Sequence, residues 1–442
     1  MQQLDYFQQT ISDLLKQAKQ QGATAAEAVV NASQGLSVDV RMNSLETIEH
    51  TTDQGLSLTV YFGQKKGSAS TTDLSPKAIQ DSLQAACHIA KYTSEDQYAG
   101  LADKELMAQN IADLDLYHPW KLSADKAIEL ALECESAALN ADKRIVNSDG
   151  AQVSNGEGLF VYGNSQDFIG GYPTSRQSIS CAVIAEQNNQ MQRDYWYSSS
   201  RHFEDLLKPA DIGLQAAERT LARLEGQSLS TRNAPVIFRW DIASSLLRSL
   251  IGAISGGNIY RKSSFLLDCV GQPIFPDFVQ IKENPLLKKG LSSAPFDNEG
   301  VATKAGDLVT DGILQRYVLG SYSARKLNLQ TTANAGGVRN LSIAPSQQGL
   351  TQQALMQQMG TGLMVTELMG HGLNMVTGDY SRGASGFWVE NGEIQYPVEE
   401  ITIAGNLKDL FANLVAVADD FNGQSSTRTG SWLFENMAIA GE

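Results

Sequence analysis

The sequence predicts an α+β fold, with an N-terminal domain of helices on an antiparallel sheet and a mostly antiparallel C-terminal β domain with one buried helix. Apolar and polar residues alternate in short runs divided by Gly, Asn-Gly or Asp-Gly, which is typical of antiparallel strands joined by tight turns. Between these runs lie stretches with apolar residues at helical spacing. The segment 226–235 is polar and turn-rich and ends in proline. We therefore expect two domains, residues 1–228 and 229–442.

The N-terminal domain is expected to alternate helices and strands. Residues 3–21 carry apolar side chains on one face, so we expect a helix. Residues 27–62 alternate apolar and polar side chains, and we expect three or four strands there, with breaks at glycines such as Gly35 and Gly55. The further expected elements are a helix at 75–91 opened by Ser75-Pro76, a helix from Ser123, four strands within 144–200, and a helix at 203–224.

The C-terminal domain is expected to be β-rich. A helix is predicted over 241–254 and a short one over 350–359. Asn391-Gly392 separates two apolar strands and is the strongest hairpin signal in the chain, because a two-residue type I′ turn needs positive φ at both positions. Asp311-Gly312 predicts a second turn of this kind.

Composition excludes several classes of function. The chain has 442 residues, 34 basic and 49 acidic, with a formal net charge of -15, which argues against a nucleic-acid or anionic-membrane surface. It has no apolar run of membrane-spanning length, and its first residues do not have the pattern of a signal peptide. The four cysteines are scattered, which favours reduced thiols and a cytoplasmic protein.

Histidines give little support for a metal site in this chain. There are five, and none is paired with another at helical spacing. Thr366–His371 imitates a zinc motif without its first histidine, but the glycines around it favour turns and strands. We expect His371 to be a surface or core-edge residue, and we expect no metal ligand or catalytic residue in this chain.

Three segments carry a resemblance to a known family: TELMG, GDYSRGASGFWVENGEI and PVEEITIAGNLKDL. They are similar to the C-terminal signature of the TldD/PmbA family, in its PmbA (TldE) branch. The resemblance implies a subunit of a zinc metalloprotease, paired with a TldD-like partner that holds the zinc. It also implies small or unfolded peptides as substrates, in microcin-type peptide maturation and antitoxin degradation. A self-dimer of the isolated chain stays possible, and a historical label of the family is modulator of DNA gyrase.

The resemblance also places the family's zinc helix on this sequence. Where the TldD branch has a His-Glu-x-x-x-His helix, this chain has Arg248 and Ala253 at the two histidine positions and Ser249 at the glutamate position. Arginine stays protonated and cannot bind zinc, and serine cannot replace the carboxylate base. We therefore expect this chain to have lost the zinc chemistry, with no cofactor of its own.

The glycine-rich segment 378–386 suggests a role in substrate binding. We expect a loop whose Asp379, Tyr380 and Arg382 line a peptide cleft that faces the partner's zinc. The alternative is an exposed turn in which Asp379 and Arg382 pair with each other. The apolar runs GLMVTELM and GFWVENG further suggest that this sheet supplies the pairing surface.

Two other classes of function stay open at this point. The chain could be an autonomous peptidase with an unrecognised site, which activity of the isolated chain would favour. It could also be a non-enzymatic modulator of DNA gyrase, which direct binding to gyrase would favour.

Overall fold

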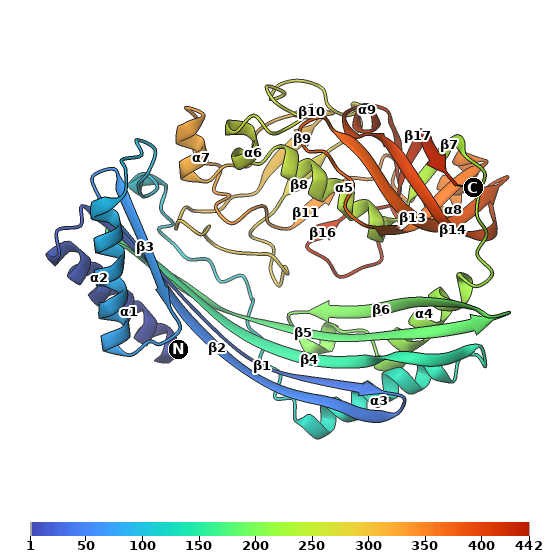
Figure 1. Cartoon of the computed structure of the whole chain (residues 1–442), viewed down its shortest axis with the longest axis horizontal. Coiled ribbons are helices and arrows are strands. Elements are labelled where there is room, and N and C mark those ends of the chain that lie inside the picture. Colours follow the sequence, from blue (N-terminus) through green and yellow to red (C-terminus); the bar gives the residue numbers. More distant parts are fainter. Residues whose placement is uncertain (1, 442) are drawn as a thin grey trace.

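The N-terminal half is built on one long, curved antiparallel sheet (Figure 1). The computed structural model describes residues 2–441. The sheet has six strands in the order β3-β2-β1-β4-β5-β6. The elements of this half are α1 (Gln2–Gln20), β1 (Ala25–Arg41), β2 (Ser44–Phe62), β3 (Lys65–Thr71), α2 (Pro76–Tyr92), the 3₁₀ turn Lys104–Leu106, α3 (Ala124–Leu139), β4 (Ile145–Asn164), β5 (Phe168–Gln187), β6 (Gln190–Ser200), the 3₁₀ turn Phe203–Asp205 and α4 (Pro209–Ala222).

Two helix pairs cover the same face of this sheet at its two ends. In β1, the buried residues at both ends have even numbers, so they point to one face. Val30 packs in a cluster with α1 and α2, whereas Val38 packs in a second cluster with α3 and α4. The predicted caps are confirmed, because Ser75 and Ser123 accept backbone N–H groups at the starts of α2 and α3. The last helix starts six residues later than expected, at Pro209, after a 3₁₀ turn.

The strands are longer and fewer than the sequence suggested. Gly35 and Gly55 were expected to end strands, but they lie inside β1 and β2 and pair with the neighbouring strands. The two strands expected within 144–164 likewise form the single strand β4. At Gly35 an added Cβ would lie 2.5 Å from the carbonyl oxygen of Asn155. Gly35 thus allows close contact between strands rather than a turn, whereas at Gly55 the nearest atom to an added Cβ is 3.8 Å away.

The C-terminal half contains two smaller sheets, in the orders β14-β13-β12-β7-β17-β15 and β10-β9-β8-β11-β16. Its elements are β7 (Arg232–Phe238), α5 (Trp240–Ala253), α6 (Gly256–Tyr260), β8 (Ile281–Glu283), β9 (Gly306–Thr310), β10 (Ile313–Leu314), α7 (Ser321–Lys326), β11 (Leu341–Ile343), α8 (Gln352–Met359), β12 (Gly362–Met369), β13 (Asp379–Glu390), β14 (Glu393–Asn406), α9 (Leu407–Ala412), β15 (Leu414–Val417), β16 (Thr427–Arg428) and β17 (Trp432–Ala440). The α+β fold class is thus confirmed. Asn391 and Gly392 have φ of 52° and 77°, and Asp311 and Gly312 have 49° and 72°, so both predicted hairpin turns are confirmed.

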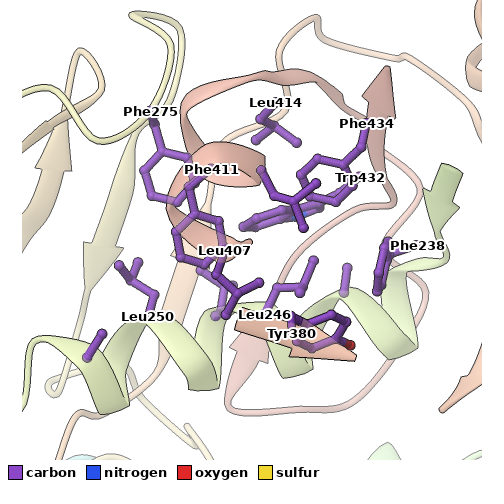
Figure 2. Packing of buried hydrophobic residues seen from close by; sticks show 14 of the residues in the cluster. Phe238, Leu246, Leu250, Phe275, Tyr380, Leu407, Phe411, Leu414, Trp432 and Phe434 are labelled. Atoms are coloured by element: carbon purple, nitrogen blue, oxygen red, sulfur yellow. The ribbon is translucent and has the colours of Figure 1, made fainter. Parts of the chain in front are cut away.

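The larger C-terminal sheet is buried on both faces. On one face α5 and α9 pack in a cluster with Phe411 and Trp432, as Figure 2 shows. On the other face α8 contributes Leu355 to a cluster that contains Met364 of β12. The apolar runs that suggested a pairing surface are therefore accounted for within the chain. Burial on both faces also explains why β12 has five consecutive buried residues, 362–366, instead of an alternating pattern.

The C-terminal half lies against the concave side of the long sheet (Figure 1). Phe296 contacts the rings of Phe160, Phe168 and Tyr172 of that sheet. Further along, the Arg325 guanidinium donates hydrogen bonds to the backbone carbonyls of Tyr98, Gly100 and Leu101. None of the helices in the described part of the chain is long and apolar enough to cross a membrane.

Candidate functional site: a cavity between the two halves

A cavity of about 300 Å³ lies where the two halves meet at β6, α4 and α5. The N-terminal half contributes β6 and α4, and the C-terminal half contributes α5, the end of β12 and one residue of β13. Its lining is rich in arginine and aromatic side chains. The lining residues are Arg193, Asp194, Tyr195, Trp196, Tyr197, Arg219, Arg223, Trp240, Asp241, Ile242, Ser245, Arg248, Thr366, Glu367, Leu368 and Arg382.

Helix α5 is fixed at its start and along one face. The Arg239 N–H donates to the carbonyl of Val365 in β12 at 3.1 Å, and the Arg239 guanidinium forms two hydrogen bonds with the Asp241 carboxylate. The apolar residues at helical spacing, among them Leu246 and Leu250, point into the core. The opposite face of α5 is therefore left to the cavity.

Three of the cavity arginines are neutralised by carboxylates. Arg219 lies 3.3 Å from Asp194 and 3.2 Å from Asp241. Arg223 pairs with Glu367 of β12 and lies 3.7 Å from Asp194, so this pair joins the two halves. Burial favours a higher pKa for Asp241, but the hydrogen bonds and charges of Arg239 and Arg219 outweigh it and hold the pKa below its ordinary value. Arg193 pairs with Asp149 beside the cavity.

Two arginines of the lining, Arg382 and Arg248, have no carboxylate in ion-pair range among residues 2–441. The Arg382 Nε is buried and has no hydrogen-bond partner in this part of the chain. Arg248 is exposed, and among the described residues its guanidinium donates only to the Ser244 hydroxyl, at 3.4 Å. The buried Ser245 hydroxyl likewise lacks a partner among the described residues. The cavity lining therefore holds two guanidinium charges that no carboxylate of the described chain neutralises.

Aromatic rings form one wall of the cavity. The Trp196 and Trp240 rings meet edge to face with centroids 6.0 Å apart, and the Arg219 guanidinium lies over Trp196 at 5.0 Å. Tyr195 and Tyr197 are 50% and 42% exposed. This wall is an apolar surface beside the unpaired positive charges.

Three family models match consecutive parts of the chain. They are described as PmbA/TldA metallopeptidase domain 1, central domain and C-terminal domain, and they match residues 26–90, 117–224 and 231–441. Metalloprotease PmbA of Escherichia coli O157:H7 is 53% identical over 417 residues, covering 94% of this chain and 92% of that protein. The Metalloprotease PmbA homolog of Haemophilus influenzae is 51% identical over 436 residues, covering 98% and 96%.

The chain belongs to the PmbA/TldD metallopeptidase family. A solved structure from Bacteroides thetaiotaomicron, described as a modulator of DNA gyrase, has a TM-score of 0.92 and 29% identity and covers 98% of both chains. TldE of Thermococcus kodakarensis shares the fold with a TM-score of 0.82, covering 98% of this chain and 100% of that one, at 18% identity.

Within this family fold, the three predicted cleft residues lie at the start of β13. The segment expected to be a glycine-rich loop begins the strand β13 instead. Asp379 points away from the cavity, and its carboxylate accepts hydrogen bonds from Thr377 and Asn406. Tyr380 is 3% exposed and lies in the core beside Leu246 (Figure 2). Of the three residues, only Arg382 lines this cavity, and the expectation that Asp379, Tyr380 and Arg382 line a cleft facing a partner's zinc stays a prediction.

The three positions that the resemblance assigned to the zinc motif have side chains in different environments. Arg248 lines the cavity, the Ser249 hydroxyl donates to the carbonyl of Ser245 at 3.0 Å, and Ala253 is fully buried. Positions five residues apart point about 140° apart around a helix, so Arg248 and Ala253 face different surroundings. Their side chains end in a guanidinium, a hydroxyl and a methyl group.

A catalytic zinc does not fit the donors that α5 presents. Within residues 2–441, no group of three or more His, Cys, Asp or Glu side chains is placed to hold a metal ion. His371 is exposed in the segment after β12. Arg248 stays protonated and Ser249 uses its hydroxyl within the helix, so neither supplies a zinc ligand or a carboxylate base.

Most of the cavity lining was missed from the sequence. Trp196, Arg219 and Trp240 come from three elements that are far apart along the chain, and no local spacing connects them. The one available signal was the aromatic run Tyr195–Tyr197, because three large rings in a row on an edge strand exceed what a solvated strand needs.

Proposed function

We propose that this chain is the PmbA/TldE-type subunit of a cytoplasmic TldD–PmbA zinc metallopeptidase, in which a TldD-like partner supplies the zinc and the hydrolysis. The observation that carries this proposal is the chemistry of α5. At the positions that the resemblance assigns to the zinc motif, this helix presents Arg248, Ser249 and Ala253, which offer no zinc ligand. The relatives are named metalloproteases, so the family activity implies a metal, and the proposal assigns that metal to the partner.

The chain's own contribution would be to bind substrate. The cavity at α5 combines an aromatic wall with unpaired positive charge, which suits extended peptide segments. Small or unfolded peptides are the proposed substrates, including precursors of microcin-type antibiotics and released antitoxins. This assignment rests on the family resemblance and on the cavity's capacity to hold a short segment.

The test separates the two chains. The full chain and a TldD-like protein of the same organism are purified separately, assayed alone and together on an unfolded peptide, and analysed for zinc. We expect the mixture to hydrolyse the peptide, the partner to hold the zinc, and this chain alone to do neither. Hydrolysis by this chain alone, with stoichiometric zinc, would establish an autonomous peptidase instead.

The description of the Bacteroides relative favours a second candidate, modulation of DNA gyrase. Binding of this chain to purified gyrase without any partner would support it. Because the chain carries a net charge of -15, we expect no contribution from DNA contacts.

A further inference from the structure

The charge of the cavity differs in sign from that of the chain. The lining holds five arginines and three carboxylates, whereas the whole protein has a net charge of -15. Asp194, Asp241 and Glu367 are already engaged with Arg219 and Arg223. Arg382 and Arg248 are left without a counter-charge among the described residues, so an anion entering the cavity would not displace an existing pair.

Two lining residues of the cavity, Arg382 and Ser245, carry buried donors without a partner in the described chain. Seven buried side-chain N or O atoms lack a partner in the described part of the chain, and they include Arg382 Nε, Ser245 Oγ and Tyr380 OH. Tyr380 and Arg382 lie two residues apart on one face of β13, and Arg382 lines the cavity together with Ser245 of α5. Buried donors without partners are costly, and such groups in a native protein are commonly satisfied by a ligand or by water.

We propose that this cavity is a binding subsite for a peptide carboxylate, held by Arg382 and Arg248 with the Ser245 hydroxyl as a further donor. A planar guanidinium matches a carboxylate with two parallel hydrogen bonds, and both Arg382 and Arg248 line the cavity without an ion pair to a carboxylate of the described chain. The residue that carries the carboxylate packs against Trp196 and Trp240. The ligand's identity as a peptide rests on the proposed function, whereas the carboxylate chemistry rests on the cavity alone.

Two sources of carboxylate share this chemistry, namely the C-terminus of a peptide and an Asp or Glu side chain. Three probes distinguish them: acetyl-Ala-Ala-Phe with a free C-terminal acid, the same peptide as its C-terminal amide, and acetyl-Ala-Glu-Phe amide. Each is titrated into the isolated full-length chain at low salt, with calorimetry and tryptophan fluorescence as readouts. Trp196 and Trp240 line the cavity, so binding there should change the fluorescence.

We expect at least one carboxylate peptide to bind on the order of tenfold to a hundredfold more tightly than the neutral amide. Preference for the free acid assigns the site to a C-terminus, and preference for the glutamate peptide assigns it to an acidic side chain. Equal affinity for all three peptides, or no binding of any, would overturn the proposal.

Variants locate the site. Arg382→Gln and Arg248→Gln should each remove most of the preference for the carboxylate. Because Arg248 is exposed, its variant is not expected to disturb folding, and it keeps the test valid if the Arg382 variant is unstable. The matched control is Arg261→Gln, since Arg261 is exposed, bonds only to Tyr260 and Asn258 among the described side chains, and lies outside the cavity lining. Equal preference in the Arg382, Arg248 and Arg261 variants would contradict the assignment.

The outcome is independent of catalysis. Carboxylate binding by the isolated chain, together with a pair that hydrolyses nothing, would keep this inference and remove the proposed function. Hydrolysis by the pair, with no carboxylate preference in this chain, would support the proposed function and contradict the carboxylate subsite.

Discussion

The two large sheets of this protein are buried in different ways. The N-terminal sheet has helices on one face at its two ends, and between them its strands are only partly covered, as at residues 154–160 of β4. The larger C-terminal sheet has apolar clusters on both faces, formed with α5 and α9 on one side and α8 on the other. The first sheet is thus long and only partly covered, whereas the second sheet is the centre of a hydrophobic core against which α5 packs.

This difference explains which sequence patterns could be misread. Alternating patterns indicate a sheet with one solvated face, and they predicted both ends of β1 and the C-terminal end of β2 well. The continuous apolar run of β12 suggested a subunit interface, whereas α5 and α8 bury it within the chain. An apolar run is therefore evidence of burial, and the partner that buries it has to be found in the fold.

The largest expected effect tests this contrast directly with two leucines. Leu363 in β12 is fully buried, whereas Leu159 in β4 is only partly buried in the middle of the long sheet. Leu363→Ala should lower the free energy of unfolding by about 2–5 kcal/mol because it leaves a cavity in a packed core. Leu159→Ala should cost about 1 kcal/mol. Urea unfolding of both variants measures this, and equal losses would show that the two sheets are supported alike.

A pH effect is expected where the two halves meet. Asp297 is fully buried next to Phe296 and accepts hydrogen bonds from the N–H groups of Glu299, Val301 and Ala335. Burial, opposed in part by these hydrogen bonds, raises the pKa of Asp297 to about 6 from its ordinary 3.8. The folded protein then binds this proton more tightly than the unfolded chain does. The resulting stability is present below pH 4 and is lost as pH rises to about 6.

Asp297→Asn removes the titrating carboxyl group, so this variant is the reference against which the pH dependence of the natural protein is measured. The free energy of unfolding of the natural protein, minus that of the variant, should fall by roughly 2–2.5 kcal/mol between pH 4 and pH 7. Denaturant unfolding at intervals across this range measures the difference. A difference that stays constant or grows with pH would mean that Asp297 is ionised throughout.

The sequence was sufficient for features that local chemistry determines. Ser75 and Ser123 cap helices, and Asn391-Gly392 makes a hairpin, because these structures need only neighbouring residues. The cavity was not predictable in this way, since Arg382 meets Trp196 and Arg219 only through the packing of the two halves. The boundary between residues 228 and 229 and the role of Arg382 in a cleft stay predictions.

The sequence analysis was wrong in expecting a strand break at Gly35 in the middle of the long sheet, and this position leads to the last prediction. Gly35 of β1 and Gly156 of β4 are directly paired and neither has positive φ, so backbone conformation does not require glycine at either position. Their surroundings differ, because an added Cβ at Gly35 would lie 2.5 Å from the Asn155 carbonyl oxygen, whereas at Gly156 the nearest atom, the Arg176 carbonyl oxygen, is 3.7 Å away.

Gly35→Ala should therefore lower the free energy of unfolding by about 1–3 kcal/mol. Gly156→Ala should leave it unchanged or raise it by up to about 1 kcal/mol, because alanine restricts the unfolded chain. Thermal and urea unfolding of the two variants decide the matter. If Gly35→Ala is as stable as Gly156→Ala, the strands can move apart at this point, and the partly covered middle of the sheet is a flexible joint rather than a closely paired support.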